Sequence, residues 1–157
     1  MMFSTALLLL TSAPVSSPPE GVFKAFAEVC LTNVGDTQQQ ISVAEKKYNA
    51  KVVPRNTVKG VALQSDVFAF HVIADGTATC ATISPIDNTV GLEGMTAAIG
   101  NALGGAAPNE VNAPDMAYWL ITTEGIEGVF SILLLVSSET GQNRASLMIS
   151  RVKGPIK

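Results

Sequence analysis

The chain contains two cysteines, Cys30 and Cys80, separated by fifty residues. Three interpretations of the pair are open: a disulfide, two buried free thiols, or a reactive or redox-active site. The sequence has no C-x-x-C motif and no cationic helix end beside either cysteine, which disfavours reactive chemistry. We therefore favour a disulfide between Cys30 and Cys80. It requires Cα atoms within about 7 Å of each other, so the fold must bring these two segments together.

The first cysteine lies in the stretch FAEVCLTN, residues 26–33, where apolar residues recur at spacings of three and four. This spacing predicts a helix with one apolar face, and Cys30 lies on that face. Asp36 and Gln39 then form a D-x-x-Q capping pattern, which predicts a second helix running to about Tyr48. The expected buried stripe of this second helix consists of Ile41, Ala44 and Tyr48.

From Thr57 the apolar residues alternate, which predicts strands. Asp75-Gly76 between two of these strands is a strong signal for a two-residue hairpin turn. Counting outward from that turn places His71 opposite Cys80. The three predicted strands are VKGVALQ (58–64), VFAFHVIA (67–74) and TATCATIS (77–84).

The predicted register divides the hairpin into two faces. Cys80 lies on one of them, so the predicted disulfide requires the first helix to cover that face. Phe68, Phe70 and Val72 lie on the other face, which needs a second covering layer. If that layer is absent, these three residues form a candidate surface for a ligand or for dimerisation. Trp119, from a later strand, is a further candidate for this surface, although core packing is the favoured interpretation of its aromatic cluster.

The second half of the chain repeats the same order of elements. A helix is predicted at about 89–103, and its glycines suggest close packing against a neighbouring backbone. Three strands follow, and the middle one is apolar on both faces and therefore predicted to be central. These strands are MAYWLITT (116–123), GVFSILLLVSS (128–138) and ASLMISRV (145–152). The predicted class is α+β: two helices, a three-stranded antiparallel meander, a helix and a second three-stranded antiparallel meander, in a single domain at 21–157.

The first twenty residues differ in composition from the rest of the chain. An apolar run at 6–10 is followed by small residues and by the Pro- and Ser-rich stretch PVSSPPEG. This order is typical of a secretory signal peptide followed by a linker, so we predict a periplasmic or secreted protein. An apolar tail without a targeting role is the alternative. No stretch reaches the roughly 20 apolar residues that a membrane-spanning helix needs, so no transmembrane span is expected.

Composition disfavours several classes of function. The net charge is −3 and the ten Lys and Arg residues are scattered, so nucleic acid is not an expected partner. His71 is the single histidine and both cysteines are assigned to a disulfide, so neither a metal site nor a cofactor is expected. The glycine-rich GNALGG (100–105) lacks the Lys and Ser or Thr of a phosphate-binding loop. We expect His71 to fill space in the sheet.

These observations favour a small exported, non-enzymatic domain that binds an unidentified protein or small ligand, or acts as an inhibitor. A carboxylate-based hydrolase is one alternative, and it requires a pocket that joins at least two acidic residues. A homodimeric structural module that pairs through an aromatic sheet face is another. The acidic candidates for the hydrolase are Asp66, Asp87, Glu110, Glu124 and Glu127.

Overall fold

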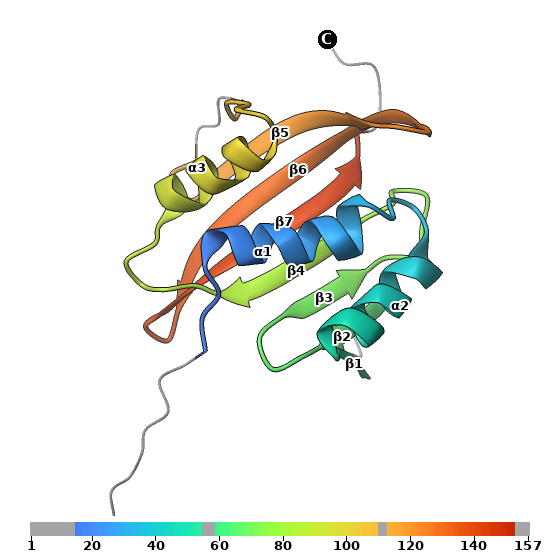
Figure 1. Cartoon of the computed structure of the whole chain (residues 1–157), viewed down its shortest axis with the longest axis horizontal. Coiled ribbons are helices and arrows are strands. Elements are labelled where there is room, and N and C mark those ends of the chain that lie inside the picture. The colour runs from blue at the N-terminus through green and yellow to red at the C-terminus, as the bar shows by residue number, and fades with distance from the viewer. Residues whose placement is uncertain (1–14, 55–58, 110–112, 153–157) are drawn as a thin grey trace, which may run out of the picture.

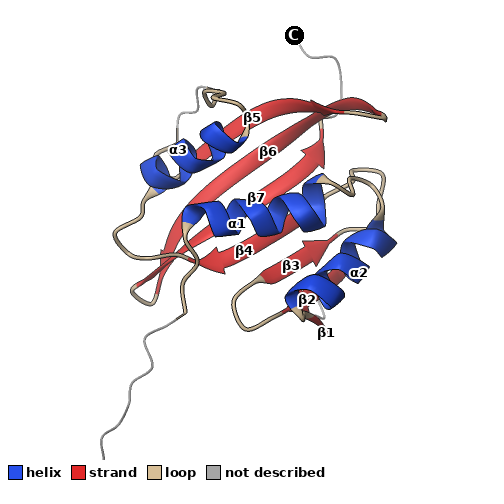
Figure 2. Ribbon diagram, viewed as in Figure 1, coloured by secondary structure: helices blue, strands red, loops and turns tan. Residues whose placement is uncertain are grey.

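The computed structural model describes residues 15–54, 59–109 and 113–152. In these residues a seven-stranded antiparallel sheet, in the order β1-β2-β3-β4-β7-β6-β5, carries three helices on one of its faces (Figures 1 and 2). The helices are α1 (Pro19–Phe26), which continues into the π-helical turn η1 (Ala27–Leu31), α2 (Thr37–Tyr48) and α3 (Leu92–Ala102). The strands are β1 (Lys51–Val53), β2 (Val61–Gln64), β3 (Ala69–Val72), β4 (Cys80–Pro85), β5 (Met116–Thr123), β6 (Ile126–Glu139) and β7 (Gln142–Arg151).

The α+β class is confirmed, but the prediction of two separate meanders is wrong. β7 pairs with β4 from Cys80↔Ile149 to Pro85↔Arg144, so both sets of strands form one continuous sheet. β1 is an additional strand that pairs with β2 at the edge. The central position predicted for β6 is confirmed within its own group, because it pairs with β5 on one side and β7 on the other.

The first helix begins two residues before residue 21, the predicted start of the domain. Pro19 opens α1, and proline suits this position because the first helical turn leaves its N–H groups without partners. The backbone N–H of Ser17 also donates to the carbonyl of Pro85 at 3.0 Å. The apolar run of the predicted signal segment lies outside the described residues. Within the described part of the chain, no helix is long and apolar enough to cross a membrane.

The capping pattern at the start of α2 is confirmed, because the backbone N–H of Gln39 donates to Asp36 Oδ1 at 3.1 Å. The buried stripe of α2 differs from the prediction. Ala44 is fully buried, whereas Ile41 and Tyr48 are half-buried. Gln40, which was not predicted to be buried, is 2% exposed and its Nε2 donates to the Cys30 carbonyl at 3.4 Å. α2 therefore also packs through a polar contact to η1.

The predicted register of the β3–β4 hairpin is wrong by one residue. Val72 pairs with Cys80, and His71 pairs with Ala81. The turn is longer than two residues: the N–H of Ile73 donates to the Thr79 carbonyl, and residues 74–78 form the loop. The Asp75 side chain accepts the N–H of Thr77, and Ala78 adopts a left-handed conformation with φ 52°. A shift of one residue moves every side chain to the opposite face of the sheet.

As a result, Cys80 shares its face with Phe70 and Val72, and this is the face that the helices cover. The side chains of this face are almost fully buried against the helix layer. Its strand residues include Phe70, Val72, Cys80, Thr82, Trp119, Phe130, Ile132, Leu134, Leu147 and Ile149. The helices contribute Val22, Ala25, Phe26, Val29, Cys30, Ala44, Met95 and Ile99.

The opposite face of the sheet carries none of the described helices (Figure 2). We call it the open face. The name is used for the uncharged central part of this side, on β3 to β7, where every side chain except Ala81 is partly or fully exposed. Lys51, Arg144 and Glu139 lie on the same side of the sheet, at its borders. The open face consists of Ala69, His71, Ala81, Ile83, Met116, Tyr118, Leu120, Ser131, Leu133, Leu135, Ser146, Met148 and Ser150.

One glycine of α3 marks a close approach between backbones, as the sequence predicts. A Cβ at Gly100 would lie 2.8 Å from the carbonyl oxygen of Ala106, in the loop that follows the helix. The same oxygen accepts a hydrogen bond from Trp119 Nε1 at 3.2 Å. This contact fixes α3 and its loop against β5. By contrast, a Cβ at Gly91 would meet no atom within 4 Å.

Candidate functional site

The predicted disulfide between Cys30 and Cys80 is present, with 5.5 Å between the Cα atoms. It joins η1 to the first residue of β4, and both cysteines are fully buried. The first helical segment therefore lies over the face that carries Cys80, as expected. Because both sulfurs are bonded to each other and buried, the pair holds the helix layer on the sheet and offers no thiolate for chemistry.

Three of the four residues that the sequence suggested for a binding surface are buried in the structure. Phe70, Val72 and Trp119 are 1%, 0% and 2% exposed, because the true register turns them under the helices. Phe68 is half-buried and lines a cavity. His71 lies on the open face and does not oppose Cys80. Phe68 is thus the one member of the predicted set that reaches solvent at a concave site.

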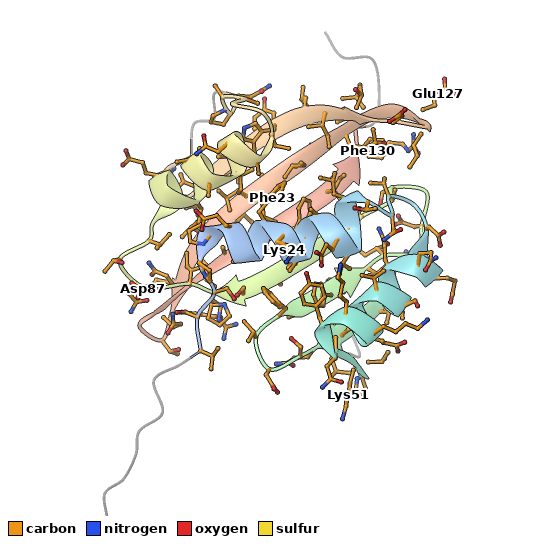
Figure 3. The ribbon with its side chains drawn as sticks, viewed as in Figure 1. Phe23, Lys24, Lys51, Asp87, Glu127 and Phe130 are labelled. Carbon is orange, nitrogen blue, oxygen red and sulfur yellow. A yellow bond between two sulfur atoms is a disulfide. The ribbon has the colours of Figure 1, made fainter. Side chains whose placement is uncertain are left out.

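That cavity lies between α1 and α2 and has a volume of about 420 Å³. We call it the helix groove. A second hollow of about 320 Å³ shares three of its residues and extends it toward the β2–β3 turn. Figure 3 marks Lys24 on α1, at the front of the molecule where the helix layer lies. The helix groove is lined by Ser17, Pro18, Gly21, Lys24, Glu28, Lys47, Tyr48 and Phe68.

A polar network joins the two helices in this groove. The Tyr48 hydroxyl donates to Glu28 Oε2 at 2.5 Å, and Lys47 Nζ lies 3.1 Å from Glu28 Oε1. Burial, followed by the hydrogen bond to Glu28, raises the pKa of Tyr48 well above its ordinary value. The hydrogen bond from Tyr48 is the largest of the effects that lower the pKa of Glu28. Tyr48 is therefore held as a protonated donor and Glu28 as a carboxylate at neutral pH.

The base of the groove is aromatic. The rings of Tyr48 and Phe68 meet edge to face with 5.4 Å between centroids, and Phe70 lies next to both. Lys24 is exposed on the rim and makes no ion pair among the described residues, whereas Lys47 is paired with Glu28. Two lysines and one glutamate leave the groove with a net charge of about +1. A cationic rim above an aromatic base suits a ligand with one anionic group and one flat apolar group.

The acidic residues proposed for a hydrolase are not gathered in one pocket. Asp66 lines the hollow next to the groove, while Asp87 accepts hydrogen bonds from the nearby Thr89. Figure 3 shows Asp87 and Glu127 at opposite ends of the molecule. Glu124 lies in the β5–β6 turn and is exposed, and residue 110 is outside the described residues. Across the described ranges, no cluster of three or more His, Cys, Asp or Glu residues could hold a metal ion.

A cavity of about 650 Å³, larger than the helix groove, lies between α3 and the start of β5. Glu93 is the one charged side chain among its lining residues, and it is exposed on α3. The cavity presents no converging set of polar groups comparable to that of the helix groove.

Sequence reasoning did not identify the helix groove, because its residues come from three separate elements. A partial signal was present. Lys24 and Glu28 are four residues apart and so share one side of a helix, and Lys47 and Tyr48 lie at the end of the next one. That these two helix surfaces meet beside Phe68 depends on how α1 and α2 are packed on the sheet.

Comparison of the chain with protein-family models, with curated proteins and with solved structures finds no match.

Proposed function

We propose that the protein is a small exported, non-enzymatic binding protein whose ligand site is the helix groove. The proposed ligand is a small monoanion that also carries an aromatic group, such as an arylcarboxylate. One observation carries this proposal: Lys24, which has no ion pair with any described residue, lies at the rim of a cavity that is also lined by the Tyr48–Phe68 aromatic pair.

The charge of the groove supports a monoanion over a phosphate. Lys47 Nζ is paired with Glu28 at 3.1 Å, and the Lys24 charge also helps to lower the pKa of Glu28. The three groups together therefore offer a ligand one net positive charge. A doubly charged phosphate group would also approach the Glu28 carboxylate, whose low pKa keeps it ionised. The aromatic base favours a flat ring, because edge-to-face and offset contacts add about 0.5–1.5 kcal/mol beyond the apolar area that is buried.

Neither Tyr48 nor Glu28 is set to exchange a proton near neutral pH, and this supports binding over catalysis. Tyr48 donates to Glu28, and its raised pKa opposes loss of that proton near neutral pH. Both oxygens of Glu28 already have partners. General acid–base catalysis needs a group that exchanges protons near the working pH, and neither residue meets this condition.

Export is supported by the Cys30–Cys80 disulfide, because such bonds persist in oxidising compartments and are rare in the cytosol. The signal-like composition of residues 1–20 supports the same location. The intact mass of protein recovered from the cell envelope tests this. The expected result is a chain that lacks part of residues 1–20 and is two hydrogens lighter than its reduced form. Retention of Met1 in cytoplasmic material with two free thiols would refute export.

The ligand site is tested by titration of the disulfide-bonded protein with phenylacetate and with phenylacetamide, monitored by NMR. The acid is expected to shift the resonances of Tyr48 and Phe68 and to bind more tightly than the neutral amide. In the Lys24→Gln variant the preference for the acid should fall about three- to fivefold, the worth of a partly exposed ion pair. Lys51→Gln is the matched control, because Lys51 is an exposed lysine on edge strand β1, away from α1 (Figure 3).

Two results would contradict the proposal. One is equal affinity for the acid and the amide in the wild-type protein, since the lysine would then contribute nothing. The other is an acid preference that falls equally in Lys24→Gln and Lys51→Gln, which would indicate a general effect of net charge.

A further inference from the structure

We propose that two copies of the protein pair through the open face, sheet against sheet, with the helix layers pointing outward. This inference does not depend on the helix groove, which lies on the other side of the sheet. It follows from the side chains that the register places on the uncovered face, from the area of that face and from its lack of charge.

The open face is apolar across five neighbouring strands. The pairing partners His71, Ala81, Met148, Leu133 and Tyr118 form one row across β3, β4, β7, β6 and β5. A second row consists of Ala69, Ile83, Ser146, Leu135 and Met116. Large apolar side chains dominate both rows at the centre and toward β5. Contiguous apolar patches of more than a few hundred Å² are uncommon on monomeric proteins and mark interaction sites.

The area of the face matches what a stable dimer buries. Strands lie about 4.8 Å apart and same-face residues recur about every 6.8 Å, so each position covers about 33 Å² and the open face covers about 420 Å². The same side of the sheet continues past the open face, and its bordering positions bring the area to about 650 Å². These bordering residues are Lys51, Val53, Ala62, Gln64, Pro85, Ser137 and Arg144. Two copies would therefore bury about 1,300 Å² in total, within the roughly 1,200–2,000 Å² of specific interfaces.

The lack of charge at the centre of the face favours a second copy as the occupant. In a two-fold interface each patch meets itself, so a lone charge near the axis would face its own copy. The charged side chains on this side of the sheet lie at its borders. Lys51 is on edge strand β1, and Arg144 and Glu139 are paired with each other at 3.4 Å. Two such sheets can pack about 10 Å apart with their strands nearly aligned.

Sedimentation equilibrium of the disulfide-bonded protein tests the proposal. The wild type is expected to be a dimer at about 10 µM. Leu133→Arg places a charge at the centre of the open face and should weaken the dimer at least about 100-fold, because the charge would be buried without a partner. Ser146→Arg adds the same charge at a smaller side chain, so it tests the same face if Leu133→Arg does not fold. Val52→Arg is the control, because Val52 is 56% exposed on edge strand β1, outside the open face.

Far-UV circular dichroism of each variant shows whether the fold is retained. Folded, monomeric Leu133→Arg or Ser146→Arg together with dimeric Val52→Arg would support the proposal. A wild-type protein that stays monomeric up to about 100 µM would overturn it, even if another protein co-purifies with it. A dimer that persists in both open-face variants, or that is lost in Val52→Arg alone, would also overturn it.

Discussion

Replacing both Cys30 and Cys80 by alanine should lower the free energy of unfolding by about 4–6 kcal/mol. The larger part comes from the unfolded chain, since a cross-link across 50 residues removes loop entropy worth about 4 kcal/mol at 25 °C. The smaller part comes from packing, because both sulfurs are fully buried and each truncation leaves a small cavity worth about 1 kcal/mol. A loss of this size is a large fraction of the roughly 5–15 kcal/mol that stabilises a typical domain.

Guanidinium unfolding at pH 7 measures the effect, and reduced wild-type protein separates its two parts. Because the disulfide is buried, the wild type is reduced in denaturant and then refolded in the presence of a phosphine reductant. This reduced form keeps both sulfurs, so it should lose about 4 kcal/mol, while the double alanine variant loses about 1–2 kcal/mol more. The slope of the transition should also increase, since an uncross-linked chain exposes more surface on unfolding. Reduced and oxidised proteins that agree within about 1 kcal/mol would refute the entropic reasoning.

Three further predictions concern the helix layer. Tyr48→Phe should lower the free energy of unfolding by about 1–2 kcal/mol in urea, because the half-buried carboxylate of Glu28 loses its shortest hydrogen bond. The depressed pKa of Glu28 stabilises the fold at neutral pH, and this contribution is lost as the pH falls below about 4.5; Glu28→Gln should therefore be less stable at pH 7 and lose less stability on acidification. An identical acid dependence in both proteins would contradict this assignment. Gly100→Ala should lower the melting temperature although alanine favours helices by about 1 kcal/mol, because its methyl group would lie 2.8 Å from a loop carbonyl oxygen. Gly94→Ala in the same helix should not lower it, because its methyl group would meet only the end of the Val90 side chain, at 3.3 Å.

Local structure was predictable wherever neighbouring residues carry the signal. The Asp36 cap of α2 depends on contacts three residues apart and was correctly predicted. The turn at Glu124 and Gly125, where Thr123 pairs with Ile126, is equally local. The Asp75-Gly76 turn looked equally clear, yet Ala78 takes a left-handed conformation and lengthens the loop. Because strand faces alternate with a period of two, this single extra residue reversed the predicted faces.

The candidate site was less predictable than the fold. Phe68 was the one residue proposed from the sequence as part of a binding surface that lines the helix groove, and it was selected for an incorrect sheet face. Lys24 and Tyr48 meet there because α1 and α2 are both held on the same side of the sheet, near the start of β3. The proximity of two such residues depends on packing between segments far apart in the chain. The residue types alone do not specify which segments pack together.

The sequence by itself determined the type of each main helix and strand, the helical face on which Cys30 lies, and its pairing with Cys80. These features follow from periodicity, capping residues and the scarcity of cysteines, which act within a few residues or leave one partner available. Only the tertiary structure decided that β7 joins β4, that all three helices lie on one face and that an apolar sheet face remains uncovered. These features depend on which edges and faces meet, and many pairings of the same strands satisfy the same local pattern.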